Sequence, residues 1–397
     1  MTTADRIVMG CSSSIVLEEP TPPAVTPATA FVSSIGPRRP ETVATVYRRL
    51  DEEICALEST TPGARLVTAK GWVELLKSSS GTRRVVPALE ASPELPNGLE
   101  ESLRRASPAP DLIDGARKEM VQVVLRLDIV RNPIRATQQE EFIARLSRTA
   151  MEQEADHFRD EMVAHALRRT LALHSAFERL KRLYHEQDAL LSPLYNGPGM
   201  PGMSLDEQRI DSELEAARDV RDRLGGAVEQ WRTAGALLRA AAKALHQTVN
   251  YWELLGVSVV KEEASQTISL ALDTRYTCHG ALIALEAAQA ALPEVEVPHV
   301  TIRQQSAVRH ALIYLLTDMV QPARYQHTRD VFTVFSANVS KAVHWVHDCY
   351  STTLRQDYDS ADQAATLLAK ALREERLRYL RRRFPNKTYT RPPAAVG

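Results

Sequence analysis

The stretch that decides the fold is residues 205–255, which read LDEQRIDSELEAARDVRDRLGGAVEQWRTAGALLRAAAKALHQTVNYWELL. Apolar or small residues recur in it with alternating steps of four and three: Leu224, Val228, Trp231, Gly235, Leu238, Ala242, Leu245, Val249 and Trp252. This spacing keeps one stripe on one side of an α-helix, as in a coiled coil or a long helical bundle. At about 1.5 Å per residue the helix would be roughly 75 Å long, so we expect an elongated fold.

A second stripe of the same kind lies upstream, in residues 137–191. Its members are Met162, Ala166, Thr170, Leu173, Phe177, Leu180, Tyr184, Gln187 and Leu191. The proline- and glycine-rich residues 193–202 must end this helix. Ser204 and Glu207 then have the spacing of a capping box, which predicts a new helix from Leu205.

Two long helices joined by a short loop fold back on each other as an antiparallel hairpin. We therefore predict a coiled-coil-like helical hairpin over residues 111–255, with a kink or break at Asn132 and Pro133. Gly225 and Gly226 lie inside the second helix, where they mark either a bend or a close contact with another helix.

The other segments complete an all-α prediction. Residues 41–59 read as a short amphipathic helix, and residues 60–110 as a proline-punctuated linker with at most one helical turn, at 72–76. Residues 256–384 form a C-terminal helical region, with helices at 261–292, 301–319, 324–354 and 359–384. In the last helix we expect a buried face of Ala364, Leu367, Leu368, Ala371 and Leu377. Residues 1–40 and 385–397 are predicted to be disordered tails.

The composition excludes several classes of protein. Lys and Arg number 49 against 50 Asp and Glu, which argues against a protein that binds nucleic acid specifically. The four cysteines lie far apart without metal-ligand spacing, which favours a reducing, cytoplasmic location. No run of eighteen uncharged apolar residues occurs, and the start has no signal-peptide pattern.

One short motif in the N-terminal tail has a specific chemistry. Residues 9–14, Met-Gly-Cys-Ser-Ser-Ser, match an N-myristoylation pattern with a cysteine for palmitoylation beside the glycine. Myristoylation of Gly10 requires a free α-amino group, so translation must begin at Met9 or the preceding residues must be removed. The alternative is a serine-rich tail that contains these letters by chance. With lipid on both Gly10 and Cys11, the chain would carry the two signals that stable anchoring needs.

A basic segment closes the last predicted helix. Between residues 373 and 391 it carries eight basic residues against two acidic ones, with Leu377, Tyr379, Leu380 and Phe384 interleaved. We single out Arg378, Arg381, Arg382, Arg383 and Lys387 as a candidate patch for an anionic membrane. The same residues could hold RNA, or simply complement the negative end of the helix dipole.

The chain also resembles a family of uncharacterised animal proteins that begin Met-Gly-Cys and carry a charged coiled coil before a helical C-terminal region. The resemblance rests on residues 9–14, on Tyr251-Trp252 and on the stretch TDMVQPARYQH at residues 317–327. It implies an all-α fold and acylation at Gly10 and Cys11, and it supplies no activity. This chain has eight residues before Met9.

The sequence offers no convincing catalytic or metal site, and we expect no cofactor. Glu154 and His157 have the spacing of a di-iron helix, but no second copy occurs on another segment. His344, His347 and Asp348 could supply two ligands from one helix face, and no third ligand is identifiable. Phosphate-binding glycine loops and nucleophile motifs are also missing, so we predict that the protein is not an enzyme.

The sequence thus predicts a helical scaffold or adaptor that binds protein partners through its helix faces. Acylation and the basic segment would hold it at the cytoplasmic membrane surface. One alternative is a curvature-sensing protein of the BAR type. Another is a soluble coiled-coil assembly protein without lipid contact, and apolar faces left over on the C-terminal helices could drive formation of a homodimer.

Overall fold

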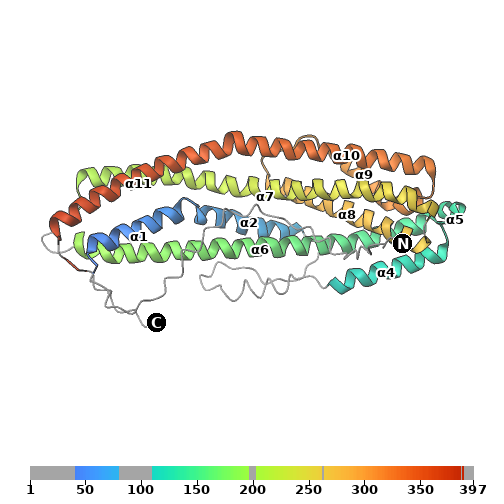
Figure 1. Cartoon of the computed structure of the whole chain (residues 1–397), viewed down its shortest axis with the longest axis horizontal. Helices are drawn as coiled ribbons and strands as arrows, with labels where there is room; N and C mark the ends of the chain where they lie inside the picture. The colour runs from blue at the N-terminus through green and yellow to red at the C-terminus, as the bar shows by residue number, and fades with distance from the viewer. Residues whose placement is uncertain (1–40, 80–109, 196–202, 262, 386, 389–397) are drawn as a thin grey trace, which may run out of the picture. The chain divides into compact units, whose positions relative to one another are not determined.

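The computed structural model describes residues 41–79, 110–195, 203–261, 263–385 and 387–388. Within these residues the protein is all-α, as predicted, and the only extended pairing is one antiparallel bridge between Thr42 and Thr388. The helices, coloured from blue to red in Figure 1, are α1 (Val43–Glu58), α2 (Pro62–Ser79), α4 (Pro110–Leu127), α5 (Pro133–Gln138), α6 (Glu140–Tyr195), α7 (Leu205–Lys261), α8 (Ala264–Ala291), α9 (Ile302–Asp318), α10 (Pro322–Cys349), a π turn η1 (Tyr350–Leu354) and α11 (Arg355–Arg383).

The chain divides into two compact units, each built from separate stretches of sequence. In its described part, unit 1 contains residues 110–159, 233–261 and 263–346, and unit 2 contains residues 41–79, 160–195, 203–232, 347–385 and 387–388. The two long helices of the predicted hairpin, α6 and α7, contribute to both units.

Unit 1 is built around α8, which is buried on nearly all sides. Ala281, Ala284 and Ala288 of α8 are at most 2% exposed, and such small side chains let other helices approach closely. Arg275 of α8 contacts Glu154 of α6, and the Cys278 thiol bonds to Thr248 of α7. α4 and α9 also pack on this helix.

The end of α7 is fixed to the start of α10 by two aromatic rings. Trp252 and Tyr325 stack with centroids 4.9 Å apart. The indole Nε1 donates to the carbonyl of Tyr325 (3.2 Å), and the Tyr325 hydroxyl donates to the carbonyl of Trp252 (2.7 Å). A Cβ at Gly256 would lie 2.4 Å from that hydroxyl, so this glycine allows the rings to approach. We expected the helix to break after Gly256; that prediction is wrong, because α7 continues to Lys261.

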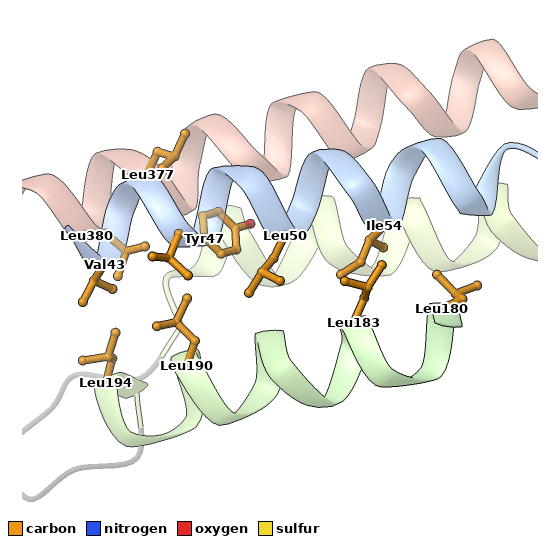
Figure 2. Packing of buried hydrophobic residues seen from close by; sticks show 11 residues of the cluster. Val43, Tyr47, Leu50, Ile54, Leu180, Leu183, Leu190, Leu194, Leu377 and Leu380 are labelled. Carbon is orange, nitrogen blue, oxygen red and sulfur yellow. The ribbon is translucent and has the colours of Figure 1, made fainter. Parts of the chain in front are cut away.

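In unit 2, α1 lies between α6 and α11. Figure 2 shows Val43, Leu50 and Ile54 of α1 pointing toward the leucines of α6. The full cluster is Val43, Val46, Tyr47, Leu50, Ile54, Leu180, Leu183, Leu190, Leu194, Leu377 and Leu380. The predicted helix at 41–59 is confirmed. α1 and α11 thus cover part of the apolar stripe of α6, which we had expected to pack on α7.

The predicted linker at 60–110 contains an 18-residue helix, α2, where we expected at most one turn. Pro62 did not prevent it, because proline is well tolerated in the first turn of a helix. Leu66, Ala69, Val73 and Leu76 recur at steps of three and four and are each at most 6% exposed. Leu66 and Ala69 pack on Leu173 of α6, so tertiary burial stabilises a helix with weak local signals.

Gly225 and Gly226 provide a close contact, which was one of the two predicted roles. The corner between α1 and α2 lies on them, and a Cβ at Gly225 would be 2.2 Å from Thr61 Oγ1. The Tyr358 hydroxyl of α11 donates to the carbonyl of Ser59 (2.5 Å) in the same corner. The corner between α1 and α2 therefore contacts both α7 and α11.

Several predicted helix ends are confirmed. α4 ends before Asn132 and Pro133, and α7 begins at Leu205. Ser204 Oγ accepts a hydrogen bond from the backbone N–H of Glu207 (3.1 Å), which is the first half of the predicted capping box. The Glu207 carboxylate accepts a hydrogen bond from Arg376 of α11.

The predicted break before residue 359 is absent, because α10, the π turn and α11 follow one another directly. α11 buries Ala365, Ala369, Leu372, Leu377 and Leu380, whereas we had expected Ala364, Leu367, Leu368 and Ala371 beside Leu377. Leu377 is buried as expected, whereas Ala365, Ala369 and Leu372 are buried because they pack on Leu214 of α7, a contact that the apolar pattern of α11 alone does not reveal.

Candidate anion-binding surface

The end of α11 is placed by its packing on α1. Leu377 and Leu380 join the cluster on α1, and the backbone N–H of Val43 donates to the carbonyl of Lys387 (3.1 Å). With the Thr42–Thr388 bridge, this corrects the prediction of a disordered tail from residue 385, because Lys387 and Thr388 pair with the start of α1. Residues 389–397 lie outside the described part.

Two arginines of the basic segment belong to the fold and not to its surface. Arg373 pairs with Asp51 of α1, and Arg376 donates to Glu207 (2.9 Å) and to Asp211 (3.2 Å) of α7. Burial would lower the pKa of Arg376, but the neighbouring Tyr47, Glu207 and Asp211 outweigh it and raise that pKa. Both arginines therefore tie α11 to its neighbours.

The five residues that we had singled out all lie on the surface: Arg378, Arg381, Arg382, Arg383 and Lys387. Arg378 pairs with Glu375, and the Lys387 ammonium lies over the Phe384 ring, 5.0 Å from its centroid. Among the described residues, Arg381, Arg382 and Arg383 have no ion pair. We call these five residues the α11 basic end.

Aromatic side chains pack just beneath the α11 basic end. Tyr379 stacks on Tyr195 of α6 with ring centroids 5.0 Å apart and planes at 17°. Phe384 meets Tyr379 edge-on at 6.4 Å. The last turn of α11 is thus anchored, and its arginines can present charge to an anion without first ordering the backbone.

Arg48 of α1 adds to this charge. α1 runs antiparallel to α11, since Val43 contacts Lys387 and Asp51 contacts Arg373, so Arg48 comes level with the last two turns of α11. Arg48 is exposed. The arginines of the last turn also complement the negative end of the α11 dipole. A cation in that position stabilises a helix by about 0.3–1 kcal/mol.

Gly10 and Cys11 lie outside the described residues. The tail that carries them joins the described fold at Glu41, next to Thr42 and its bridge to Thr388. The acylation motif and the α11 basic end are therefore connected through the same end of unit 2.

The metal candidates are not supported. Glu154 does not face His157 as a ligand pair, because its carboxylate binds Arg275 (2.7 Å) and lies 3.3 Å from His279 Nδ1. His344, His347 and Asp348 are all exposed on α10. No group of three potential metal ligands occurs in the part of the chain that the structure describes.

The buried network of Glu154, Arg275 and His279 was missed in the sequence. Each residue is at most 7% exposed. Burial would raise the pKa of Glu154, but Arg275 and His279 outweigh it and hold that pKa below its ordinary value. Arg275 and His279 lie four residues apart on α8, among buried residues that are mostly apolar, and this spacing was the available signal.

Comparison with known proteins gives no further assignment. The chain matches no family model, no curated protein and no solved structure. The resemblance to proteins beginning Met-Gly-Cys stays a prediction. In addition, none of the described helices combines the length and the apolar character that crossing a bilayer requires.

Proposed function

We propose that this protein is a non-enzymatic helical scaffold or adaptor, held at the cytoplasmic membrane surface by acylation of Gly10 and Cys11 and by the α11 basic end. The observation that carries the proposal is the exposed run Arg381, Arg382 and Arg383, which lacks ion-pair partners among the described residues. One acyl chain binds a membrane only marginally, and a basic patch supplies the second signal that stable attachment needs.

The connection of the two signals supports this reading. A lipid on Gly10 would be tethered through the tail to Glu41, and the basic residues lie beside that point through the pairing of Thr42 with Thr388. The tail can thus bring an acyl chain and the arginines to one bilayer surface. The exposed helix faces of both units then remain available for protein partners.

The basic end can be tested with unacylated full-length protein and vesicles of phosphatidylserine and phosphatidylcholine. The triple variant Arg381→Gln, Arg382→Gln, Arg383→Gln should bind roughly a hundredfold more weakly, because each basic group near an anionic surface contributes about 1 kcal/mol. The matched control replaces Arg168, Lys243 and Lys341 by Gln, because these are also exposed and removing them changes the net charge equally. Equal losses in both variants would contradict a specific surface.

The acyl chain is tested separately by intact-mass spectrometry of the protein purified from its own cells. We expect a chain that begins at Gly10 with the mass increment of a myristoyl group, and membrane release of the Gly10→Ala variant. A mature chain that begins at residue 1 or 2 without lipid would refute acylation. Vesicle binding that rises with curvature would favour the BAR-type alternative, and oligomers without lipid binding would favour a soluble assembly protein.

A further inference from the structure

A second surface, in unit 1, combines exposed apolar and basic side chains. It lies where α4 turns through α5 into α6 (Figure 1). Ile134 is 70% exposed and Phe142 is 43% exposed, and both are large apolar side chains. Arg131, Arg135 and Arg145 are exposed beside them. We call these five residues the α5–α6 corner.

Ile134 and Phe142 lie on either side of the junction between α5 and α6. Gln139 separates the two helices with a non-helical backbone (φ -107°, ψ 15°), and its N–H donates to the carbonyl of Arg135 (2.9 Å) while its carbonyl accepts from the N–H of Ile143 (3.0 Å). On α6, Arg145 follows Phe142 by three residues and therefore lies on the same face. The opposite face is buried, with Ala136, Ile143, Ala144 and Ser147 each 0% exposed.

Two acidic residues of this region, Glu140 and Glu141, have partners within unit 1. Glu140 pairs with Arg324 (2.6 Å), and Glu141 accepts from the Tyr314 hydroxyl (3.3 Å) and lies 4.0 Å from Arg148. Among the described residues, Arg131, Arg135 and Arg145 have no ion pair. The positive end of the α6 dipole at Glu140 does not favour nearby cations, whereas Arg135 lies in the last turn of α5, whose negative end favours it.

We propose that the α5–α6 corner docks on an anionic lipid surface, with Ile134 and Phe142 entering the headgroup region and the three arginines binding lipid phosphates and carboxylates. A helix that presents apolar side chains ringed by basic ones is the arrangement that binds the bilayer interface. This surface is separate from the α11 basic end, and its binding does not require an acyl chain.

The composition of the corner favours lipid over other occupants. A partner protein in a stable interface covers about 800 Å² with a continuous apolar core, whereas the corner exposes two isolated apolar side chains. A nucleic acid backbone would use the arginines but would leave the aliphatic Ile134 without a favourable contact. A bilayer interface uses both kinds of side chain.

The test uses unacylated full-length protein and vesicles with and without phosphatidylserine. The double variant Ile134→Ser, Phe142→Ser should lose about tenfold or more of its affinity for anionic vesicles, from the apolar surface that it can no longer bury. Its matched control, Ile302→Ser with Val334→Ser, removes two other exposed apolar side chains of unit 1, at 81% and 56% exposure. Circular dichroism checks that each variant folds.

Insertion is read directly with Phe142→Trp. Brominated lipids should quench its added fluorescence relative to the wild-type protein, whereas a tryptophan at Val334 should not be quenched. Unchanged binding of Ile134→Ser, Phe142→Ser, or equal quenching at both tryptophans, would overturn the proposal. If only the Arg381–Arg383 variant lost binding, the corner would be excluded while the α11 basic end stood. If only the corner variants lost binding, the α11 basic end would be excluded and the α5–α6 corner would stand.

Discussion

Two buried glutamates of unit 2 lie near two arginines each, yet their pKa values move in opposite directions. Burial would raise the pKa of Glu229, but hydrogen bonds from Arg169 (2.8 Å) and Arg65 (2.6 Å) outweigh it and lower that pKa. Burial does raise the pKa of Glu58, since Arg218 alone donates to it and Arg221 lies 4.0 Å away. Two arginines donate directly to Glu229, whereas only one donates to Glu58 and the nearby Asp222 raises its pKa further.

Replacing Glu229 should therefore cost far more than replacing Glu58. We expect Glu229→Gln to lower the free energy of unfolding at pH 7 by about 3–5 kcal/mol, because it breaks a buried ion pair. Glu58→Gln should cost less at pH 7, because the raised pKa of Glu58 means that its ionised carboxylate is less favoured in the folded state than in the unfolded state. Urea unfolding of both variants and the wild type measures this, and equal losses would contradict the assignment.

The same two variants should show opposite pH dependence. Glu229 has a folded pKa below its ordinary value of 4.5, so its contribution is present above pH 4.5 and is lost as pH falls through the folded pKa. Glu58 has a raised folded pKa, so its contribution is present below pH 4.5 and is lost as pH rises through the folded pKa. As pH rises, the free energy of unfolding of the wild type should increase relative to that of Glu229→Gln. Relative to that of Glu58→Gln, it should decrease. Parallel pH profiles would refute this.

Gly225 should not tolerate a methyl group. In Gly225→Ala the new Cβ would lie 2.2 Å from Thr61 Oγ1 and 2.7 Å from Thr61 Cβ, so the α1–α2 corner must move. We expect a loss of about 1–3 kcal/mol, as for overpacked cores. The control is Gly71→Ala in α2, where the methyl group meets nothing within 4 Å and should stabilise the helix by about 0.5–1 kcal/mol. Thermal unfolding distinguishes them.

At the scale of elements, the π turn sets which face of α11 is buried. Val339, Ala342 and Val346 of α10 recur at steps of three and four. If the α-helical period continued unbroken from Val346, the buried face would reach positions 364 and 371. α11 instead buries Ala365 and Leu372. The π turn at Tyr350–Leu354 accommodates one extra residue between α10 and α11.

Deletion of one residue should test this directly. Removing the exposed Thr352 lets the π turn become α-helix while the downstream side chains keep their partners, so we expect a change within about 1 kcal/mol. Removing the exposed Thr366 rotates Ala369 and Leu372 away from Leu214, and should cost about 3 kcal/mol or more. Denaturant unfolding of the two deletions gives the comparison, and similar losses would count against the role of the turn.

Local signals predicted most of the helix ends, and distant contacts account for the errors. Ser204 and the prolines mark ends that any helix must respect. α2 was missed because its short apolar pattern has few local helix signals and is stabilised by Leu173, about a hundred residues away in sequence. The surface arginines at 381–383 were predictable from a charged run at a helix end. The inward turn of Arg373 and Arg376 was not, because Asp51 and Glu207 lie on other helices.

At the scale of the whole molecule, the charges nearly cancel. With 49 basic and 50 acidic residues, the protein carries a formal charge of -1 and no long-range attraction to anions. Binding to an anionic surface must therefore come from local groups such as the α11 basic end and the α5–α6 corner. Within about 10 Å, the Debye length at 0.1 M salt, such groups act independently of the net charge.

This charge balance predicts how salt should separate lipid from nucleic acid. A patch of about five cations on duplex DNA should lose several hundredfold in affinity between 50 and 200 mM salt, since each phosphate contact releases counterions. Anionic vesicles should retain more of their binding over the same range, because the burial of Ile134 and Phe142 does not depend on charge. Parallel titrations by vesicle co-sedimentation and by filter binding to DNA measure the two slopes. A DNA slope as shallow as the lipid slope would point to a nucleic-acid site and against a membrane surface.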